Sequence, residues 1–177
     1  MLLNKIPVLD KGYVALLDSS NTTSKLREIG EEFFGGEYPT SLEELGTMTI
    51  VMKCPLFVQL YLSKFNLKVI NADRGSSQEA YVPSAVAIGA TEVGISQDIS
   101  DDILRTTDAL FINPKAYQAD GADRFVSQVL TPISTYTTLI VSGSYSEWCK
   151  AAYQSKLPLP ISEYARAIGQ ILEVEWK

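Results

Sequence analysis

Apolar residues recur along the chain with two spacings: alternation, which predicts strands, and helical spacing, which predicts helices. Short alternating or β-branched stretches predict strands at residues 12–18, 46–54 and 134–143, and a strand or extended segment at 67–71. Stretches with helical spacing predict helices at 23–34, 98–110, 122–130, 145–154 and 161–172, and a helix that begins at Pro55. A short helix or turn is expected at 40–45, and a polar, glycine-containing loop at 72–97. Because strands and helices are interspersed, the fold class is expected to be α/β or α+β.

The chain has 177 residues and no internal repeat, which predicts a single domain over residues 1–177. Its formal charge of -6 argues against a general nucleic-acid-binding protein, because such proteins carry a basic surface. The sequence shows neither a leader peptide nor a run of about 18 apolar residues. We therefore expect a cytoplasmic protein without membrane contact.

Histidine is absent from the sequence, which excludes a Ser-His-Asp or Cys-His nucleophile system. The two cysteines, Cys54 and Cys149, are far apart and would hold no structural zinc unaided. Three acidic residues, Asp98, Asp101 and Asp102, would form either a Mg²⁺ site or a solvated helix N-terminus, and we prefer the second reading. No metal site is predicted.

Several strings, taken in order, resemble the flavin-dependent thymidylate synthases. TSLEELGTMTIVMKCPLFVQL at 40–60 is similar to the family's Thr/Ser-Pro-Phe-Glu turn, its strand ending in Lys-Ala-Pro and the helix start that follows. VLDKGYVALLD at 8–18, EAYVP at 79–83, VLTPISTYTTLIVSGSYSEW at 129–148 and SEYARAIG at 162–169 resemble further family segments. The strings are spread along the chain from residue 8 to residue 169.

The resemblance implies a flavin-dependent thymidylate synthase-like fold, with a mixed sheet and flanking helices. It also implies a homo-oligomer, either a tetramer or a dimer, with FAD and dUMP bound between subunits. The family transfers a methylene group from methylenetetrahydrofolate to dUMP, and NADPH reduces the flavin. Flavin and nucleotide carry that chemistry, so no catalytic side chain is predicted.

The family's signature motif is largely absent from this chain. Counted from Pro55, the positions of Arg-His-Arg-x-x-Ser-x-Asn-Glu-x-Ser-x-Arg-Tyr retain only Asn71, with Lys64 preserving a charge. Gln128 and Ser162 occupy places where the family has arginine. Arginine binds phosphate bidentately and lysine does not, so these losses would weaken the binding of FAD and dUMP by orders of magnitude.

The resemblance leaves a few candidate binding residues, which are Ser41, Glu44, Lys64 and Asn71 for a cofactor and Lys68 and Arg74 for a substrate. The three basic residues would form either a residual phosphate-binding corner or a solvated helix end, and we prefer the second reading. Ser41 and Glu44 would contact flavin or cap a helix. Asn71 is more typical of a turn than of a ligand-binding position.

Five aromatic residues would either stack on a base or flavin ring, or fill the core or a subunit interface: Tyr136, Tyr145, Trp148, Tyr153 and Tyr164. The core or interface reading is the commoner one for such residues.

Three functional hypotheses follow. The first is a catalytically inactive relative of flavin-dependent thymidylate synthase that acts by binding a protein or a nucleotide. The second is an active FAD-dependent thymidylate synthase or a related pyrimidine-nucleotide flavoenzyme, with FAD as cofactor if the ancestral site is retained. The third is an assembly module. We prefer the first, because the scaffold is recognisable while its motif is erased.

Overall fold

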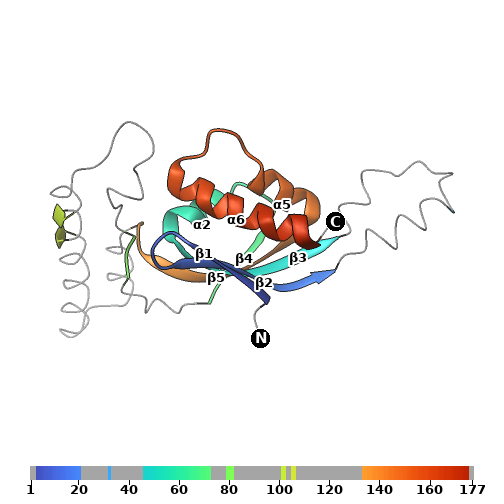
Figure 1. The fold of residues 1–177 in the computed structure, drawn as a ribbon, viewed down its shortest axis with the longest axis horizontal. Helices are drawn as coiled ribbons and strands as arrows, with labels where there is room; N and C mark the ends of the chain where they lie inside the picture. The colour runs from blue at the N-terminus through green and yellow to red at the C-terminus, as the bar shows by residue number, and fades with distance from the viewer. Residues whose placement is uncertain are drawn as a thin grey trace.

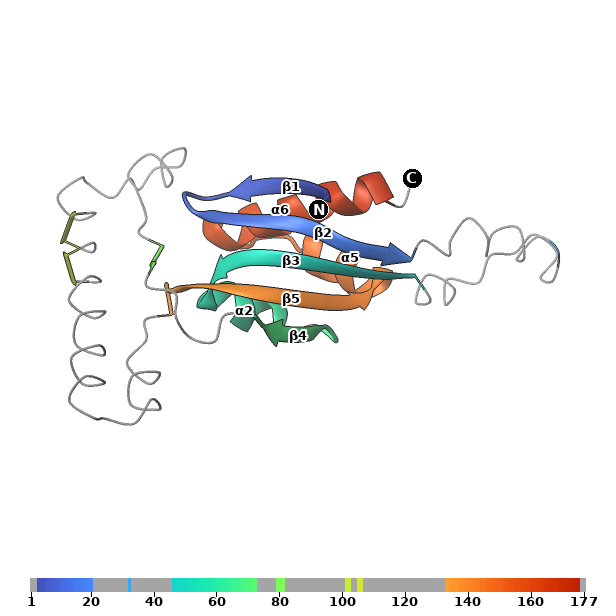
Figure 2. The same ribbon diagram turned by 90° about the horizontal axis from the view of Figure 1, so that it is seen from below.

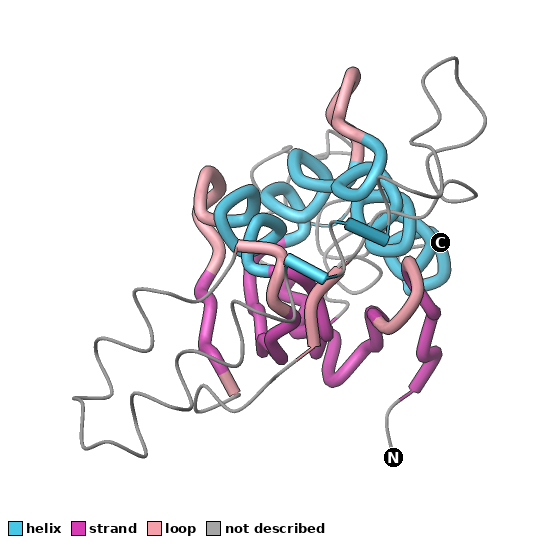
Figure 3. The backbone as a smooth tube through the Cα atoms, turned by 90° about the vertical axis from the view of Figure 1, so that its left-hand side faces the viewer, coloured by secondary structure: helices cyan, strands magenta, loops and turns pink. Residues whose placement is uncertain are grey.

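The computed structural model describes residues 3–20, 32, 46–72, 79–81, 101–102, 105–106 and 133–175. Within these residues the chain forms a five-stranded sheet of order β1-β2-β3-β5-β4. The three described helices, α2, α5 and α6, all cover the same face of the sheet (Figures 1 and 2). The opposite face, here called the open face, carries no described helix. Figure 3 shows the two layers from the side.

The strands are β1 (Leu3–Val8), β2 (Gly12–Ser20), β3 (Thr47–Pro55), β4 (Lys68–Asn71) and β5 (Tyr136–Ser144). The four predicted strands are confirmed, with ends that differ by at most two residues. The first strand, β1, is absent from the predictions. It lies at the edge of the sheet and contains a lysine and a proline, which suit an edge but break the apolar alternation that reveals a strand.

The helices are α2 (Leu56–Leu62), α5 (Tyr145–Ala152) and α6 (Leu159–Glu175), which confirm the three helices predicted at these places. Pro55 is the N-cap of α2, where its missing N–H costs no hydrogen bond. The helices predicted at 23–34, 98–110 and 122–130 and the turn at 40–45 lie outside the described residues, apart from isolated positions. No described helix is long and apolar enough to cross a membrane.

All neighbouring strands in the described sheet are antiparallel, so the mixed sheet expected from the resemblance is corrected. The helix α2 carries the chain from β3 to β4, and these two strands run in the same direction. However, β5 lies between them and pairs with both in the opposite direction. The parallel relation therefore never becomes a pair of hydrogen-bonded neighbours.

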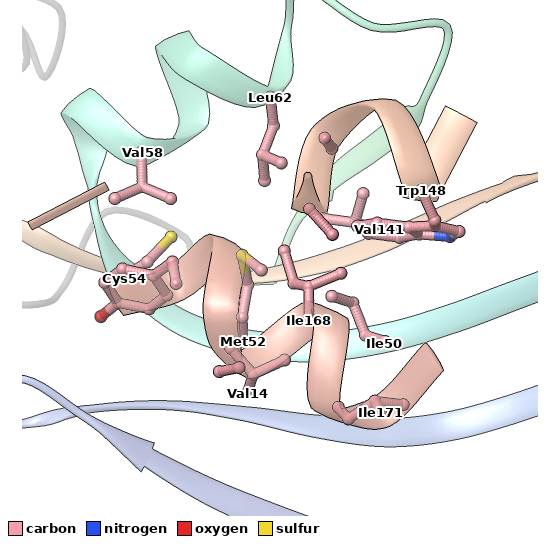
Figure 4. Close-up of a cluster of buried hydrophobic side chains, with 14 of the residues drawn as sticks. Val14, Ile50, Met52, Cys54, Val58, Leu62, Val141, Trp148, Ile168 and Ile171 are labelled. Atoms are coloured by element: carbon pink, nitrogen blue, oxygen red, sulfur yellow. The ribbon is translucent and has the colours of Figure 1, made fainter. Parts of the chain in front are cut away.

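The core lies between the sheet and the helices (Figure 4). Met48, Ile50 and Met52 alternate along β3 and are fully buried beneath the helical layer. Trp148 of α5 is also fully buried, and its Nε1 donates to the carbonyl oxygen of Met48 at 2.9 Å. That bond satisfies the indole N–H inside the core and fixes α5 over β3.

Candidate functional site

Three of the six predicted binding residues, Ser41, Glu44 and Arg74, lie outside the described residues. Lys64 follows Ser63, the C-cap of α2, and is exposed, with its Nζ 6.0 Å from the ring centroid of Tyr61. The backbone N–H of Lys64 donates to the carbonyl oxygen of Tyr61, as in a helix end. The position of Lys64 therefore agrees with the helix-end reading.

The other two predicted residues, Lys68 and Asn71, mark the two ends of β4. They are three positions apart on a strand, so their side chains lie on opposite faces and are not brought to one place. Asn71 is a strand residue rather than the expected turn residue, and its Oδ1 accepts a hydrogen bond from Thr137 Oγ1 at 3.0 Å. Pairing with β5 extends the strand through this asparagine.

Polar side chains make contacts instead at the end of the sheet where β3 ends and β5 begins. Figure 2 shows the backbone at this end of the sheet. We call this group the sheet-end cluster; it consists of Asp10, Lys53, Glu79, Tyr81, Tyr136 and Tyr164. The residues come from the β1–β2 turn, β3, the segment 79–81, β5 and α6. Five separate parts of the sequence thus converge at one end of the fold.

Tyr136 and Asp10 form the centre of the sheet-end cluster. Tyr136 is fully buried, and its hydroxyl donates to Asp10 Oδ1 at 2.5 Å. Burial, together with the hydrogen bond to Asp10, raises the pKa of Tyr136 well above its ordinary value, so the phenol keeps its proton. The turn that carries Asp10 contains Leu9 at φ 56°, a left-handed conformation that costs energy for leucine.

Lys53 is the cation of the cluster, and Glu79 holds it. The two side chains form a close ion pair, and the hydrogen bond from Lys53 lowers the pKa of Glu79. Backbone hydrogen bonds fix the segment that carries Glu79: Tyr136 N donates to Glu79 O at 2.7 Å, and Tyr81 N donates to Ser134 O at 2.8 Å. Glu79 is thereby positioned by the sheet itself.

Tyr164 brings α6 into the cluster. Its hydroxyl donates to the carbonyl oxygen of Lys53 at 2.9 Å, and burial raises its pKa, so it also stays protonated. The approach depends on Gly12, because a Cβ atom there would lie well inside contact distance of Tyr164 Oη. Glycine at this position therefore allows the helix to reach the sheet.

Two further buried groups complete this end of the sheet. Thr135 is 4% exposed, and its Oγ1 has no hydrogen-bond partner in the part of the chain that the structure describes. Cys54 is fully buried, and burial raises the pKa of its thiol, so it is not a reactive nucleophile. The described residues also contain no group of three acidic or cysteine side chains that would hold a metal.

The five aromatic residues named in the sequence differ in burial. Tyr136, Trp148 and Tyr164 are buried, as the core reading expects, whereas Tyr153 is 58% exposed and Tyr145 is partly buried. The two buried tyrosines also use their hydroxyls in the cluster.

Sequence reasoning missed Asp10, Lys53, Glu79 and Tyr81. A signal existed for Lys53, because it is a charged residue on the polar side of an alternating strand. Nothing local indicates Asp10 or Glu79, since their partners are 126 and 26 positions away in the sequence.

No protein-family model matches the chain, and no curated protein does. Among solved structures, it is similar to the UMP/dUMP methylase PolB from Streptomyces cacaoi bound with 5-Br dUMP, with a TM-score of 0.73 and 18% sequence identity. That match covers 94% of this chain and 92% of PolB. PolB bound with 5-Br UMP gives a TM-score of 0.73 and 19% identity, covering 94% of this chain and 91% of that one.

The two proteins share one fold. The expected flavin-dependent thymidylate synthase-like fold is therefore confirmed. At 18% identity the similarity establishes the architecture and leaves the chemistry to be argued from the residues themselves.

Proposed function

We propose that this protein is a catalytically inactive relative of the flavin-dependent thymidylate synthases that retains the binding of a pyrimidine nucleotide. The observation that carries the proposal is the ion pair between Lys53 and Glu79, because it engages the cation of the sheet-end cluster. The phosphates of a flavin cofactor and of a nucleotide need positively charged side chains that are not already paired with a carboxylate. Arginine is the residue best suited to bind such phosphates. The described cluster contains no arginine.

The remaining groups of the cluster suit the uncharged parts of a nucleotide. Asp10 and Glu79 offer carboxylate oxygens, which accept hydrogen bonds from ribose hydroxyls and from the N–H of uracil. Thr135 Oγ1 is a buried hydroxyl that would gain from a polar partner, because leaving such a group unsatisfied costs about 1–3 kcal/mol. The shared fold with a UMP/dUMP methylase supports this choice of ligand.

The test combines flavin spectroscopy with nucleotide titration. We expect the purified protein to be colourless, to gain no bound flavin absorbance with FAD, and to bind UMP or dUMP by calorimetry. With FAD, NADPH and methylenetetrahydrofolate present, no methylated nucleotide should form. Asp10→Asn should weaken nucleotide binding, whereas Lys5→Met, a control on the edge strand β1, should not.

Two results would decide against the proposal in different ways. A stoichiometric yellow complex that converts dUMP to dTMP would establish the active enzyme. Failure to bind either nucleotide in the folded protein would instead favour a protein partner or an assembly role.

We further propose that the protein is a homo-oligomer and that a second copy covers the open face. The strand register places Ala15, Val51, Ile140 and Ile70 side by side across four strands of this face. Ile70 is 62% exposed, so one copy alone leaves part of this apolar row in water. Light scattering should show a dimer or a tetramer that Ile70→Asp shifts toward monomer, while Lys68→Asp on the same strand face has less effect. A wild-type monomer would overturn this part of the proposal.

A further inference from the structure

A groove lies between α6, the end of α5 and the segment that links the two helices. It has a volume of about 420 Å³, which is in the range of small-molecule sites. Its lining shares no residue with the sheet-end cluster. The lining residues that matter for the argument are Tyr153, Gln154, Arg166, Gly169, Gln170 and Glu173.

Tyr153 gives this groove an aromatic wall. The ring lies against α6 at Gly169, where an added Cβ atom would be 3.4 Å from Cε1 of the ring. The tyrosine is nevertheless 58% exposed, so much of its surface faces solvent. The small residues Ala152 and Ala165 also line the groove.

Two charged side chains line the groove, the carboxylate of Glu173 and the guanidinium of Arg166. Glu173 lines it, and no described cation forms an ion pair with this carboxylate. Arg166 also lines the groove, but it forms a close ion pair with Glu163 of the same helix. After burial, the charge of Glu173 is the next largest cause that raises the pKa of Tyr153, which agrees with the two side chains being near each other.

We propose that this groove binds a small organic ammonium ion between the ring of Tyr153 and the carboxylate of Glu173. An aromatic face attracts a cation through its quadrupole, and a neighbouring carboxylate adds direct charge attraction. The amide groups of Gln154 and Gln170 can accept hydrogen bonds from N–H groups of a primary ammonium ion. The net negative charge of the whole chain also favours a cationic ligand.

The test uses amide chemical shifts of the folded, isotope-labelled protein. Choline and its uncharged isostere 3,3-dimethylbutan-1-ol are titrated in parallel, and Nα-acetyl-lysine methylamide is titrated as a model of a protein side chain. We expect saturable shifts of Gly169 and Gln170 with at least one cation, and at least about tenfold weaker binding of the isostere. The tighter of the two cations identifies the source as a free quaternary amine or a lysine side chain. Equal affinity for cation and isostere, or no saturable shift with either cation, would overturn the proposal.

Variants separate a specific site from general electrostatic attraction. Glu173→Gln and Tyr153→Leu should each weaken binding about three- to tenfold, because each removes one of the two contacts to the cation. Asp18→Asn removes the same unit of charge from the sheet and serves as the matched control, with affinity unchanged. A control variant that weakens binding as much as Glu173→Gln would show that only net charge matters. Both groove residues are exposed, so the melting temperature should stay near that of the parent.

Discussion

Gly12, the first residue of β2, occupies the place where the sheet-end cluster leaves the least room for another atom. A Cβ atom there would meet Tyr164 Oη and would lie 2.8 Å from the carbonyl oxygens of both Lys53 and Val8. The phenol can turn away only by losing its hydrogen bond to Lys53 O, and the two carbonyls belong to paired strands. Relief therefore requires backbone movement.

We predict that Gly12→Ala lowers the free energy of unfolding by about 2–3 kcal/mol, as overpacked cores do. Tyr164→Phe should cost about 1–2 kcal/mol, because it removes one buried hydrogen bond. The double variant should lose less than the sum, since the phenylalanine lacks the most crowded atom. Urea unfolding at neutral pH measures all three. A Gly12→Ala protein within about 0.5 kcal/mol of the parent would contradict the described packing.

Individual residues show which features of the site the sequence predicts and which it does not. Lys53 and Tyr136 are visible in it as a charged residue on a strand and an aromatic residue beside one. Their pairing with Glu79 and Asp10 depends on how distant segments meet, which no local pattern contains. Lys68 and Asn71, taken from a motif spacing, lie on opposite faces because they belong to a strand.

The attachment of α5 illustrates the scale of elements. Ser144 caps this helix, and Glu147 follows three residues later, which is the spacing of a capping box. Glu147 does not turn back to its own helix start. Its Oε2 accepts from the backbone N–H of Asn66 at 2.9 Å, and its Oε1 accepts from Lys150 Nζ. The carboxylate therefore joins α5 to the segment before β4.

Glu147→Ala should lower the free energy of unfolding by about 1–2 kcal/mol, because Asn66 N–H loses a charged acceptor. Lys150→Ala, which leaves that bond intact, should cost less than about 0.5 kcal/mol. Hydrogen bonds from Lys150 and Asn66 lower the pKa of Glu147, so its contribution is present above the ordinary pKa of 4.5 and lost as pH falls. Denaturant unfolding at pH 7 and pH 3 should show the cost of Glu147→Ala shrinking in acid. An unchanged cost would mean that the carboxylate charge plays no part.

Among the elements, the sequence predicts those in which apolar or β-branched residues follow a clear local pattern. The strand β3 alternates strictly, and β5 is β-branched, so both are evident from sequence. The edge strand β1 has no such pattern, and its stability comes from pairing with β2. The sequence does not predict the antiparallel pairing of the sheet either. That pairing arises because β5 lies between β3 and β4, and this strand order depends on how the chain folds back on itself.

For the molecule as a whole, three buried groups that keep their protons limit the stability of the fold at high pH. Burial raises the pKa values of Cys54, Tyr136 and Tyr164 above their ordinary values of 9.0 and 10.0. In the folded protein these groups keep their protons, while the unfolded chain releases them near those ordinary values. Above about pH 9 the unfolded state therefore binds fewer protons, and the free energy of unfolding must fall as pH rises.

We predict that stability falls progressively above about pH 9–10, by about 1.4 kcal/mol per pH unit for each group that has to release its proton. Tyr136→Phe and Tyr164→Phe should each reduce the steepness of this fall by one proton, even though both variants start from a lower stability at pH 7. Tyr153→Phe is the comparison variant: burial also raises the pKa of Tyr153, but its ring is largely exposed, so its removal should reduce the slope less than the removal of either buried tyrosine. Denaturant unfolding at intervals between pH 7 and pH 11 gives the slopes directly. If the buried-tyrosine variants fall as steeply as the parent, the two phenols are not held protonated by the fold, and alkaline loss must arise elsewhere in the chain.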